Sequence, residues 1–227
     1  MADANAVQST WAPLRYRPYW GLVFAGALFL VFVLLYAQVV PPLEGPDAGA
    51  HFRYAIYLRD HGLPPLDAER AEISHQLVQQ PPLYYGLVAA ASLFSPGDET
   101  LGLEELNPYL EKGLSRRATV TPLEPPSLTV AWPLYAAVII ATVGGLLAVA
   151  GTWLLVHAMM PHTPLLATAA AVVVGLNPQF LFSAATVTND TWTAATTVLA
   201  MWLAVCALKQ PQRPWLWLAA GMVAGLA

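Results

Sequence analysis

Long uncharged apolar stretches, separated by polar segments, dominate the chain. No charged residue occurs from Pro18 to Leu43, and residues 19–40 are long enough to cross a hydrocarbon core of about 30 Å as a helix. Further apolar stretches occupy residues 131–160, 165–187, 191–208 and 215–227. The last has 13 residues, which reach only about 20 Å at about 1.5 Å per residue. We therefore expect four complete spans and a chain that stops inside a fifth.

This pattern predicts an all-α integral membrane protein with about five transmembrane helices, the fifth truncated, and a large outer loop that carries juxtamembrane helices. A cleavable signal peptide has a shorter apolar stretch with small residues at the cleavage site. Here two valines and two prolines, residues 39–42, follow the first stretch instead. We expect the first span to remain as an anchor.

Basic residues set the expected orientation. Arg15 and Arg17 precede the first span, and Lys209 and Arg213 lie in the short loop before the fifth. Loops with an excess of Lys and Arg stay on the cytoplasmic side, and an even number of spans separates these two loops. We expect a multi-pass protein of the plasma (inner) membrane, with residues 1–18 in the cytoplasm and residues 41–130 outside.

Residues 41–130 form an outer or periplasmic loop too long for a simple connector, and long loops are usually functional or disordered. From Pro41 to Thr129 the loop holds 12 of the 14 acids and 6 of the 10 bases, so its local net charge is −6. Its apolar spacing predicts an amphipathic surface helix from Asp47 to Asp60. A second juxtamembrane helix is expected from Pro82 to Phe94, because prolines suit a first helical turn.

Composition agrees with a lipid environment and narrows the functional classes. Hydrophobic residues make up 57% of the chain and charged residues 11%, with a mean hydropathy of +0.53, whereas soluble domains are about 25% charged. The net charge is −4 and the few basic residues form no patch, which argues against a nucleic-acid partner. With Cys206 as its single cysteine, the chain has no disulfide framework.

One acidic residue stands alone in the apolar half of the chain. Asp190, in the sequence Thr188-Asn189-Asp190-Thr191-Trp192, is the only charged side chain between Pro125 and Leu208. One interpretation is helix capping, since Asn and Asp satisfy free backbone N–H groups and favour the positive dipole end. The other is a functional site, because ionisable residues near membranes are usually retained for function. The expected topology places Asp190 on the side of the outer loop.

A second polar motif follows the first span directly. In Pro46-Asp47-Ala48-Gly49-Ala50-His51, the acid and the histidine are four residues apart. On a helix this spacing places both on one face, where they could share a cation or form a carboxylate–imidazole pair. A purely structural pair is the alternative.

A third motif opens the second juxtamembrane helix. The sequence Gln79-Gln80-Pro81-Pro82-Leu83-Tyr84-Tyr85 combines two amides and two phenols with a proline start. Gln80, Tyr84 and Tyr85 are candidate substrate-binding residues, and an aromatic belt at the membrane interface is the other interpretation.

Together these motifs resemble the N-terminal module of the GT-C class of integral-membrane glycosyltransferases, which use polyprenyl-phosphate-linked sugars. The resemblance covers about residues 19–208 and rests on three features in the family's order. They are an acid just after the first span (Asp47, with His51), a Gln-Pro-Pro-Leu-Tyr-Tyr motif, and an Asn-Asp pair after the third expected span (Asn189-Asp190).

The resemblance implies roles for both acids. Asp47 looks like the family's catalytic acid, which serves as a base or positions the acceptor while a lipid phosphate leaves. Asp190 looks like the acid of the second outer loop, which helps organise a site that often depends on a divalent metal ion, here with Asp47, His51 and Asp190 as candidate ligands. The chain departs from the family at Ala48, where many members have a second acid.

The phosphate of such a donor needs a cationic partner. Arg53, Arg116 and Arg117 lie on the expected outer side, and a guanidinium can hold phosphate through two hydrogen bonds. A solvated surface charge is the alternative for each arginine taken singly.

The sequence therefore predicts the N-terminal part of a GT-C-like enzyme that moves a sugar from a polyprenyl-phosphate donor to an acceptor at the outer membrane face. Its partners would be the lipid bilayer and the lipid-linked sugar. A non-catalytic subunit packed among other membrane subunits is a second hypothesis. A transporter is a third, suggested by Asn177-Pro178 within the third apolar stretch, since broken helices line substrate paths.

Overall fold

A computed structural model describes residues 19–64, 80–95, 105–106, 119–120 and 128–226. The prediction of a helical chain is confirmed within these residues, which form eight helices and one antiparallel pair of two-residue strands, β1 (Glu105–Leu106) and β2 (Thr119–Val120). The helices are α1 (Trp20–Val39), α2 (Ala48–His61), α4 (Leu83–Ala91), α5 (Leu128–Met159), α6 (Pro164–Gly175), α7 (Pro178–Ala184), α8 (Asp190–Lys209) and α9 (Trp215–Ala224).

Three of these helices are long and apolar enough to cross a membrane: α1, the part of α5 from Trp132 to Met159, and α8. Helices α6 and α7 would together make a fourth span, bent by 66° at the break between them. Many large apolar side chains of α1 are exposed, among them Val23, Phe24 and Leu34, which fits contact with lipid. The fifth expected span corresponds to α9, which has 10 residues, and the count of five spans stays a prediction.

The third apolar stretch is not one continuous helix. Asn177 adopts an extended backbone between α6 and α7, and its side chain accepts hydrogen bonds from the N–H groups of Gln179 and Phe180 at 2.9 and 3.2 Å. Pro178 occupies the first position of α7, where its lack of an N–H costs nothing. An N-cap and a proline start thus begin a new helix in the middle of the apolar run.

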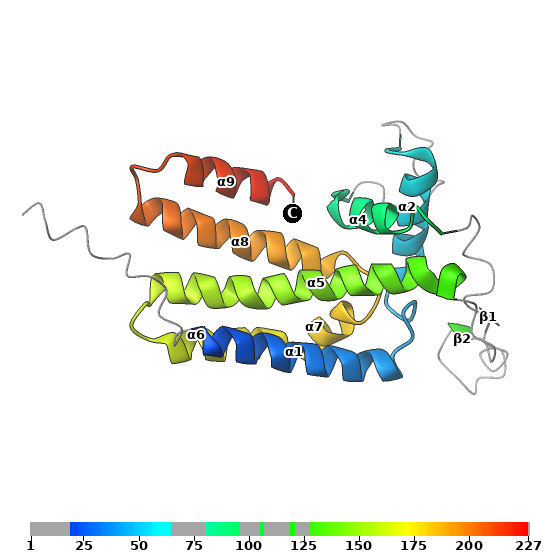
Figure 1. Ribbon diagram of the computed structural model, residues 1–227, viewed down its shortest axis with the longest axis horizontal. Helices are drawn as coiled ribbons and strands as arrows, with labels where there is room; N and C mark the ends of the chain where they lie inside the picture. Colours follow the sequence, from blue (N-terminus) through cyan, green and yellow to red (C-terminus); the bar gives the residue numbers. More distant parts are fainter. Residues whose placement is uncertain (1–18, 65–79, 96–104, 107–118, 121–127, 227) are drawn as a thin grey trace, which may run out of the picture.

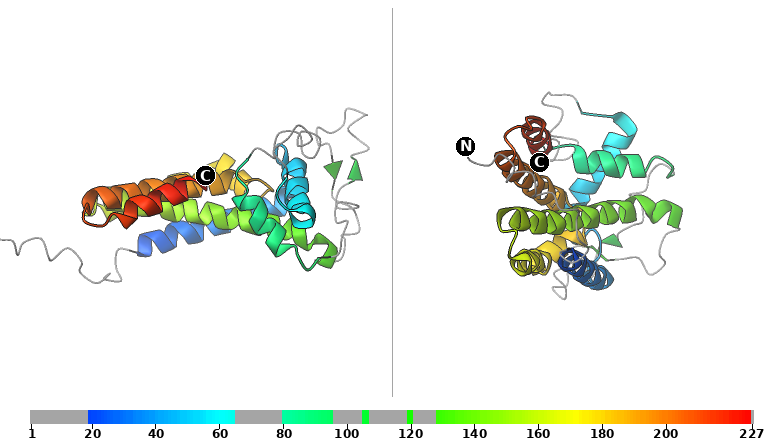
Figure 2. Two further views of the ribbon diagram at one scale, coloured as in Figure 1. Left: turned by 90° about the horizontal axis from the view of Figure 1, so that it is seen from above. Right: turned by 60° about the vertical axis from the view of Figure 1, so that its left-hand side comes forward.

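Helix α5 lies in the centre of the bundle (Figure 1). It makes its largest interface with α8 and also packs on α6 and α1; the second view in Figure 2 shows α8 and α9 on one side of it and α1 and α6 on the other. Glycines allow the close approach: a Cβ at Gly145 would lie 2.5 Å from Phe29 Cζ, and one at Gly151 would lie 2.6 Å from Val198 Cγ1. Small residues let membrane helices pack closely in this way.

Helices α2 and α4 lie beyond the bundle, at the end where α1 finishes and α8 begins (Figures 1 and 2). We call this the α2/α4 end. The two helices form where the sequence predicts surface helices, and their apolar sides share a buried cluster with α5. Its members include Phe52 and Tyr54 of α2, Tyr85 and Val88 of α4, and Ala137 of α5. This cluster fixes α2 and α4 against the start of α5 and so determines what surrounds the candidate site.

Candidate functional site

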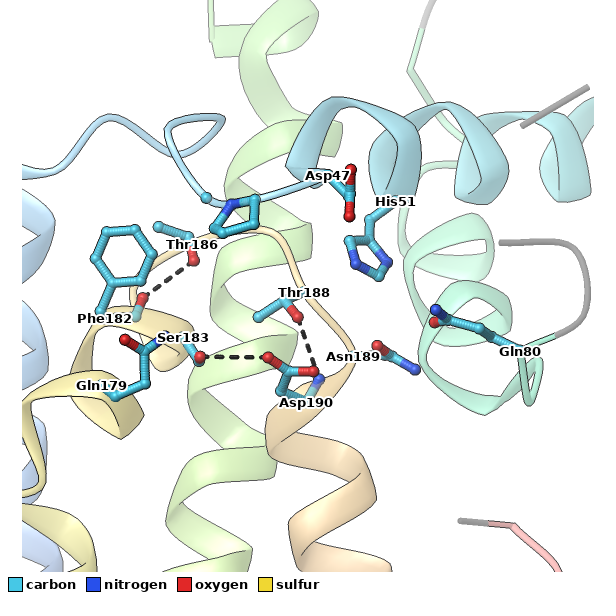
Figure 3. A pocket seen from close by; sticks show the side chains of 12 residues that line it. Asp47, His51, Gln80, Gln179, Phe182, Ser183, Thr186, Thr188, Asn189 and Asp190 are labelled. Carbon is cyan, nitrogen blue, oxygen red and sulfur yellow. Dashed lines mark hydrogen bonds between the residues drawn. The ribbon is translucent and has the colours of Figure 1, made fainter. Parts of the chain in front are cut away.

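A polar pocket of about 230 Å³ lies at the α2/α4 end of the bundle. Figure 3 shows that its side chains come from α2 and the turn before it, from Gln80 in the segment before α4, from α7, and from the segment that joins α7 to α8. The lining residues are Gly45, Pro46, Asp47, His51, Gln80, Gln179, Phe182, Ser183, Thr186, Thr188, Asn189 and Asp190. The structure therefore brings Asp47, His51, Gln80 and Asp190, which the sequence assigns to three separate motifs, to one place.

Asp47 is the N-cap residue of α2 and has a left-handed backbone, with φ 57° and ψ 10°. It is the one non-glycine residue with positive φ in the described part of the chain. Its carboxylate makes no capping hydrogen bond, and the residue is exposed. A conformation that few residues adopt, with the side chain left available, is typical of functional positions.

Ala48, where the sequence departs from the GT-C pattern, is the first residue of α2 and is 1% exposed. It belongs to the buried cluster that α2 and α4 share with α5, called the α2/α4/α5 cluster below. It does not line the pocket. The pocket thus receives one carboxylate from this turn, that of Asp47.

Asp190 is the first residue of α8. Its Oδ2 accepts a hydrogen bond from Ser183 Oγ at 3.4 Å, and its N–H donates to Thr188 Oγ1 at 3.3 Å (Figure 3). The preceding Asn189 makes no side-chain capping hydrogen bond. The negative charge still favours the helix N-terminus through the dipole, but the carboxylate contacts α7 across the pocket and does not fold back onto its own helix.

His51, Tyr85 and Gln80 form a connected hydrogen-bond chain at the edge of the pocket. The Nδ1 atom of His51 lies 2.7 Å from the Tyr85 hydroxyl, which donates to Gln80 Oε1 at 2.6 Å. The imidazole and phenol rings are stacked, with centroids 5.8 Å apart. His51 is 6% exposed and Tyr85 is fully buried, so the contact between α2 and α4 through these two side chains is shielded from solvent.

Burial is the largest influence on the pKa values of His51 and Tyr85. It lowers the pKa of His51, whereas the nearby charges of Asp190 and Asp47 act in the opposite direction. Burial also raises the pKa of the Tyr85 phenol well above its ordinary value. The phenol therefore stays protonated and serves as a hydrogen-bond donor across the physiological pH range.

Three predicted substrate-binding residues lie outside the pocket lining: Tyr85, which reaches it through its contacts with His51 and Gln80, together with Tyr84 and Arg53. Tyr84 is buried and donates its hydroxyl to the backbone carbonyl of Ala137 at 3.1 Å, so it anchors α4 to α5. Arg53 is exposed on α2, and a Cβ added at Gly49 would lie 3.5 Å from its Nη1, which places the guanidinium over the preceding turn. Arg116 and Arg117 lie outside the described residues.

The predicted metal ligands share the pocket without forming a metal site. Asp47, His51 and Asp190 all line it. Within the part of the chain that the structure describes, however, no three His, Cys, Asp or Glu side chains lie close enough together to hold one ion. A divalent cation there would need further ligands or a closer approach of these three side chains, and it stays a prediction.

Several pocket residues do not figure among the sequence-predicted site residues. Gln179, Ser183, Thr186 and Thr188 supply an amide and three hydroxyls from α7 and the α7–α8 connection. Two signals could have found them: the helix break at Asn177, which moves α7 out of the line of α6, and the cluster of hydroxyl residues just before Asp190.

Carboxylates, an imidazole, amides and hydroxyls together make a pocket suited to a ligand with several hydroxyl groups. Among the described residues its lining contains no Lys or Arg. Comparison with protein-family models, with curated proteins and with solved structures finds no match for this chain.

Proposed function

We propose that the chain acts as the N-terminal module of a GT-C-like glycosyltransferase that moves a sugar from a polyprenyl-phosphate donor to an acceptor hydroxyl. The observation that carries this proposal is the meeting of Asp47 and Asp190 in one pocket, although five described helices, α2 and α4 to α7, lie between them in the chain. Two carboxylates that line one pocket, beside the start of the apolar helix α8, combine a polar reaction site with access to a lipid-borne substrate.

The polar groups of the pocket match the needs of a sugar. The carboxylates of Asp47 and Asp190 accept hydrogen bonds from hydroxyl groups, while the amides of Gln80, Gln179 and Asn189 both donate and accept. Hydrogen bonds to charged acceptors are the stronger kind. The two carboxylates are therefore the groups best placed to orient a sugar or its acceptor.

In the proposed reaction an acceptor oxygen attacks the anomeric carbon of the sugar, and the bond from that carbon to the lipid phosphate breaks. Asp47 takes the acceptor proton or positions the hydroxyl, and Asp190 helps hold the reactants. The departing phosphate needs a cation, for which Arg53, Arg116 and Arg117 are the proposed partners. A plasma-membrane location with this pocket on the outer face completes the proposal.

The test is release of lipid phosphate by the protein in nanodiscs drawn from its native membrane, which supply the acceptor, with polyprenyl-phosphate glucose and polyprenyl-phosphate mannose as radiolabelled donors. Asp47→Asn and Asp190→Asn should each lower release at least about 100-fold, the scale of losing a positioned acid–base group. Asp60→Asn is the matched control, because Asp60 is an exposed acid of α2 that pairs with Arg59 and does not line the pocket. Wild-type release by Asp47→Asn and Asp190→Asn would refute the proposal.

A transporter is the second candidate, because the broken helix α6–α7 lines the pocket through Gln179 and Ser183, and broken helices often form substrate sites in transporters. A transporter would move a labelled sugar across a liposome membrane without releasing lipid phosphate. A non-catalytic subunit would do neither, and Asp47→Asn would leave its assembly unchanged.

A further inference from the structure

The hydrogen-bond chain at the edge of the pocket determines which nitrogen of His51 carries the proton. A phenol has one O–H donor, and the Tyr85 hydroxyl gives it to Gln80 Oε1 at 2.6 Å. The contact of 2.7 Å between Tyr85 oxygen and His51 Nδ1 therefore needs its proton from the imidazole. The geometry thus points to a proton on Nδ1, and whenever the imidazole is neutral its Nε2 carries the lone pair.

This lone pair belongs to a side chain that lines the pocket. His51 and Gln80 lie on the same side of the pocket in Figure 3, with Asn189 and Asp190 below His51. In the part of the chain that the structure describes, no hydrogen bond occupies Nε2. The ionisable groups around the ring are the carboxylates of Asp47 and Asp190 and the phenol of Tyr85. None of these three is a cation that would donate a hydrogen bond to Nε2.

We propose that Tyr85 is a positioning residue, which holds His51 in the Nδ1–H tautomer so that Nε2 accepts a hydrogen bond from a hydroxyl group of the bound ligand. The inference rests on the proposed function for the nature of that ligand, a sugar or its acceptor. It assigns Tyr85 a role through His51 and not through contact with substrate. Gln80 also has a positioning role. Its side-chain carbonyl oxygen accepts the hydrogen bond from the Tyr85 hydroxyl, and this sets the direction of both hydrogen bonds.

The tautomer can be read directly from the ¹⁵N chemical shifts of labelled histidine in the intact chain, without ligand, at about pH 8, where imidazole is neutral. The His51 signals are assigned as those missing from His51→Asn. We expect the Nδ1–H tautomer in the wild type. Gln80→Ala removes the acceptor and frees the Tyr85 proton for Nδ1, so the ring should switch to the Nε2–H form, whereas Gln80→Glu keeps an acceptor and should keep the wild-type tautomer.

Ligand binding is the second measurement, with polyprenyl-phosphate glucose and polyprenyl-phosphate mannose as probes. Tyr85→Phe should weaken binding about tenfold, the size of one directed hydrogen bond. Tyr57→Phe is the matched control, because Tyr57 is a tyrosine of α2 that stacks on His61 and does not line the pocket. It should bind as the wild type does.

The outcomes separate this inference from the proposed function. An Nε2–H ring in the wild type, or an unchanged tautomer in Gln80→Ala, would overturn the inference whatever the protein does to sugars. Wild-type affinity in Tyr85→Phe would overturn it as well. A wild type that binds neither probe would contradict the proposed function and the ligand part of the inference, while the tautomer would still decide the role of Tyr85.

Discussion

The backbone N–H of Val187 donates a hydrogen bond to the carbonyl oxygen of Pro42 at 3.0 Å. This bond joins the turn that leads to Asp47 with the turn that leads to Asp190. Val187 is also buried in the α2/α4/α5 cluster. The separation of the two carboxylates therefore depends on direct contact between these turns and not on helix packing alone.

Gly45 tests that contact. A Cβ at this position would lie 3.1 Å from Thr186 Oγ1 and 3.3 Å from Thr186 Cβ, so the branched side chain of Gly45→Val must push the two turns apart. We expect a loss of about 1–3 kcal/mol of stability and weaker binding of polyprenyl-phosphate glucose, with membrane insertion intact. In the control, Gly86→Ala, the added Cβ meets nothing within 4 Å. Equal effects of both substitutions would show that the turns tolerate separation.

Because Asp47 has a left-handed backbone, substitutions at this position can affect stability separately from sugar transfer. Asp, Asn and Gly adopt φ near 57° with little strain, whereas a residue with an ordinary Cβ loses about 1–2 kcal/mol there. Asp47→Ala should therefore lower the free energy of unfolding in mixed micelles by about 1 kcal/mol, and Asp47→Gly and Asp47→Asn should not. All three should lose sugar transfer. Equal stability of the Ala and Gly variants would contradict this account.

His51 should titrate below the ordinary histidine pKa of 6.5, because burial is the largest influence on it. The folded protein prefers the neutral ring, so this contribution to stability is complete above pH 6.5 and is lost as the pH falls through the lower folded-state pKa. Asp190 and Asp47 oppose the shift, and Asp190→Asn should lower the pKa further. NMR titration of the His51 ring measures both effects; Asp60→Asn should leave the midpoint where it is.

Gly144 connects the packing of α5 and α8 to the site. A Cβ there would lie 2.7 Å from Trp192 Cδ1 and 2.9 Å from Thr191 Oγ1. Trp192 and Thr191 donate side-chain hydrogen bonds to backbone carbonyls of α5, at 2.8 and 2.7 Å. Both residues follow Asp190 directly in the chain, so their position affects that of the carboxylate. We expect Gly144→Ala to cost about 1–3 kcal/mol of stability and to reduce sugar transfer, as measured by thermal unfolding and lipid-phosphate release.

The matched control for that substitution is Gly221→Ala, since a Cβ at Gly221 in α9 meets nothing within 4 Å. A Gly144→Ala protein with the stability and transfer rate of Gly221→Ala would show that α8 can shift without disturbing the pocket.

The helices could be predicted from the sequence because their signals are local. An uncharged, largely apolar stretch of 20 residues forms α1, and the surface helices α2 and α4 follow the expected periodicity and proline start. The break between α6 and α7 also has a local signal, Asn177 followed by Pro178. The angle between the two helices has no such signal in the sequence. A 66° bend depends on how α7 packs against α5 and α1, which no short sequence pattern contains.

The site was only partly predictable. Asp47, His51, Gln80 and Asp190 stand out as isolated polar residues, but their meeting depends on how three apolar helices return the chain to the same end. Adjacent residues of a helix point about 100° apart, so the sequence cannot say which phenol of α4 approaches the pocket. The structure directs Tyr85 to His51 and Tyr84 to α5. Ser183 was missed because a hydroxyl within an apolar helix usually bonds to its own backbone.

The break between α6 and α7 separates exposed apolar residues from residues that line the pocket. Helix α6 supplies exposed apolar residues such as Leu165 and Val173, while α7 supplies Gln179 and Ser183, one turn apart, to the pocket. The residues of α7 that line the pocket can therefore vary without any change in the exposed apolar residues of α6. Under the proposed function, ligand preference diversifies through substitutions at the pocket positions of a seven-residue helix, while the exposed apolar residues of α6 stay the same.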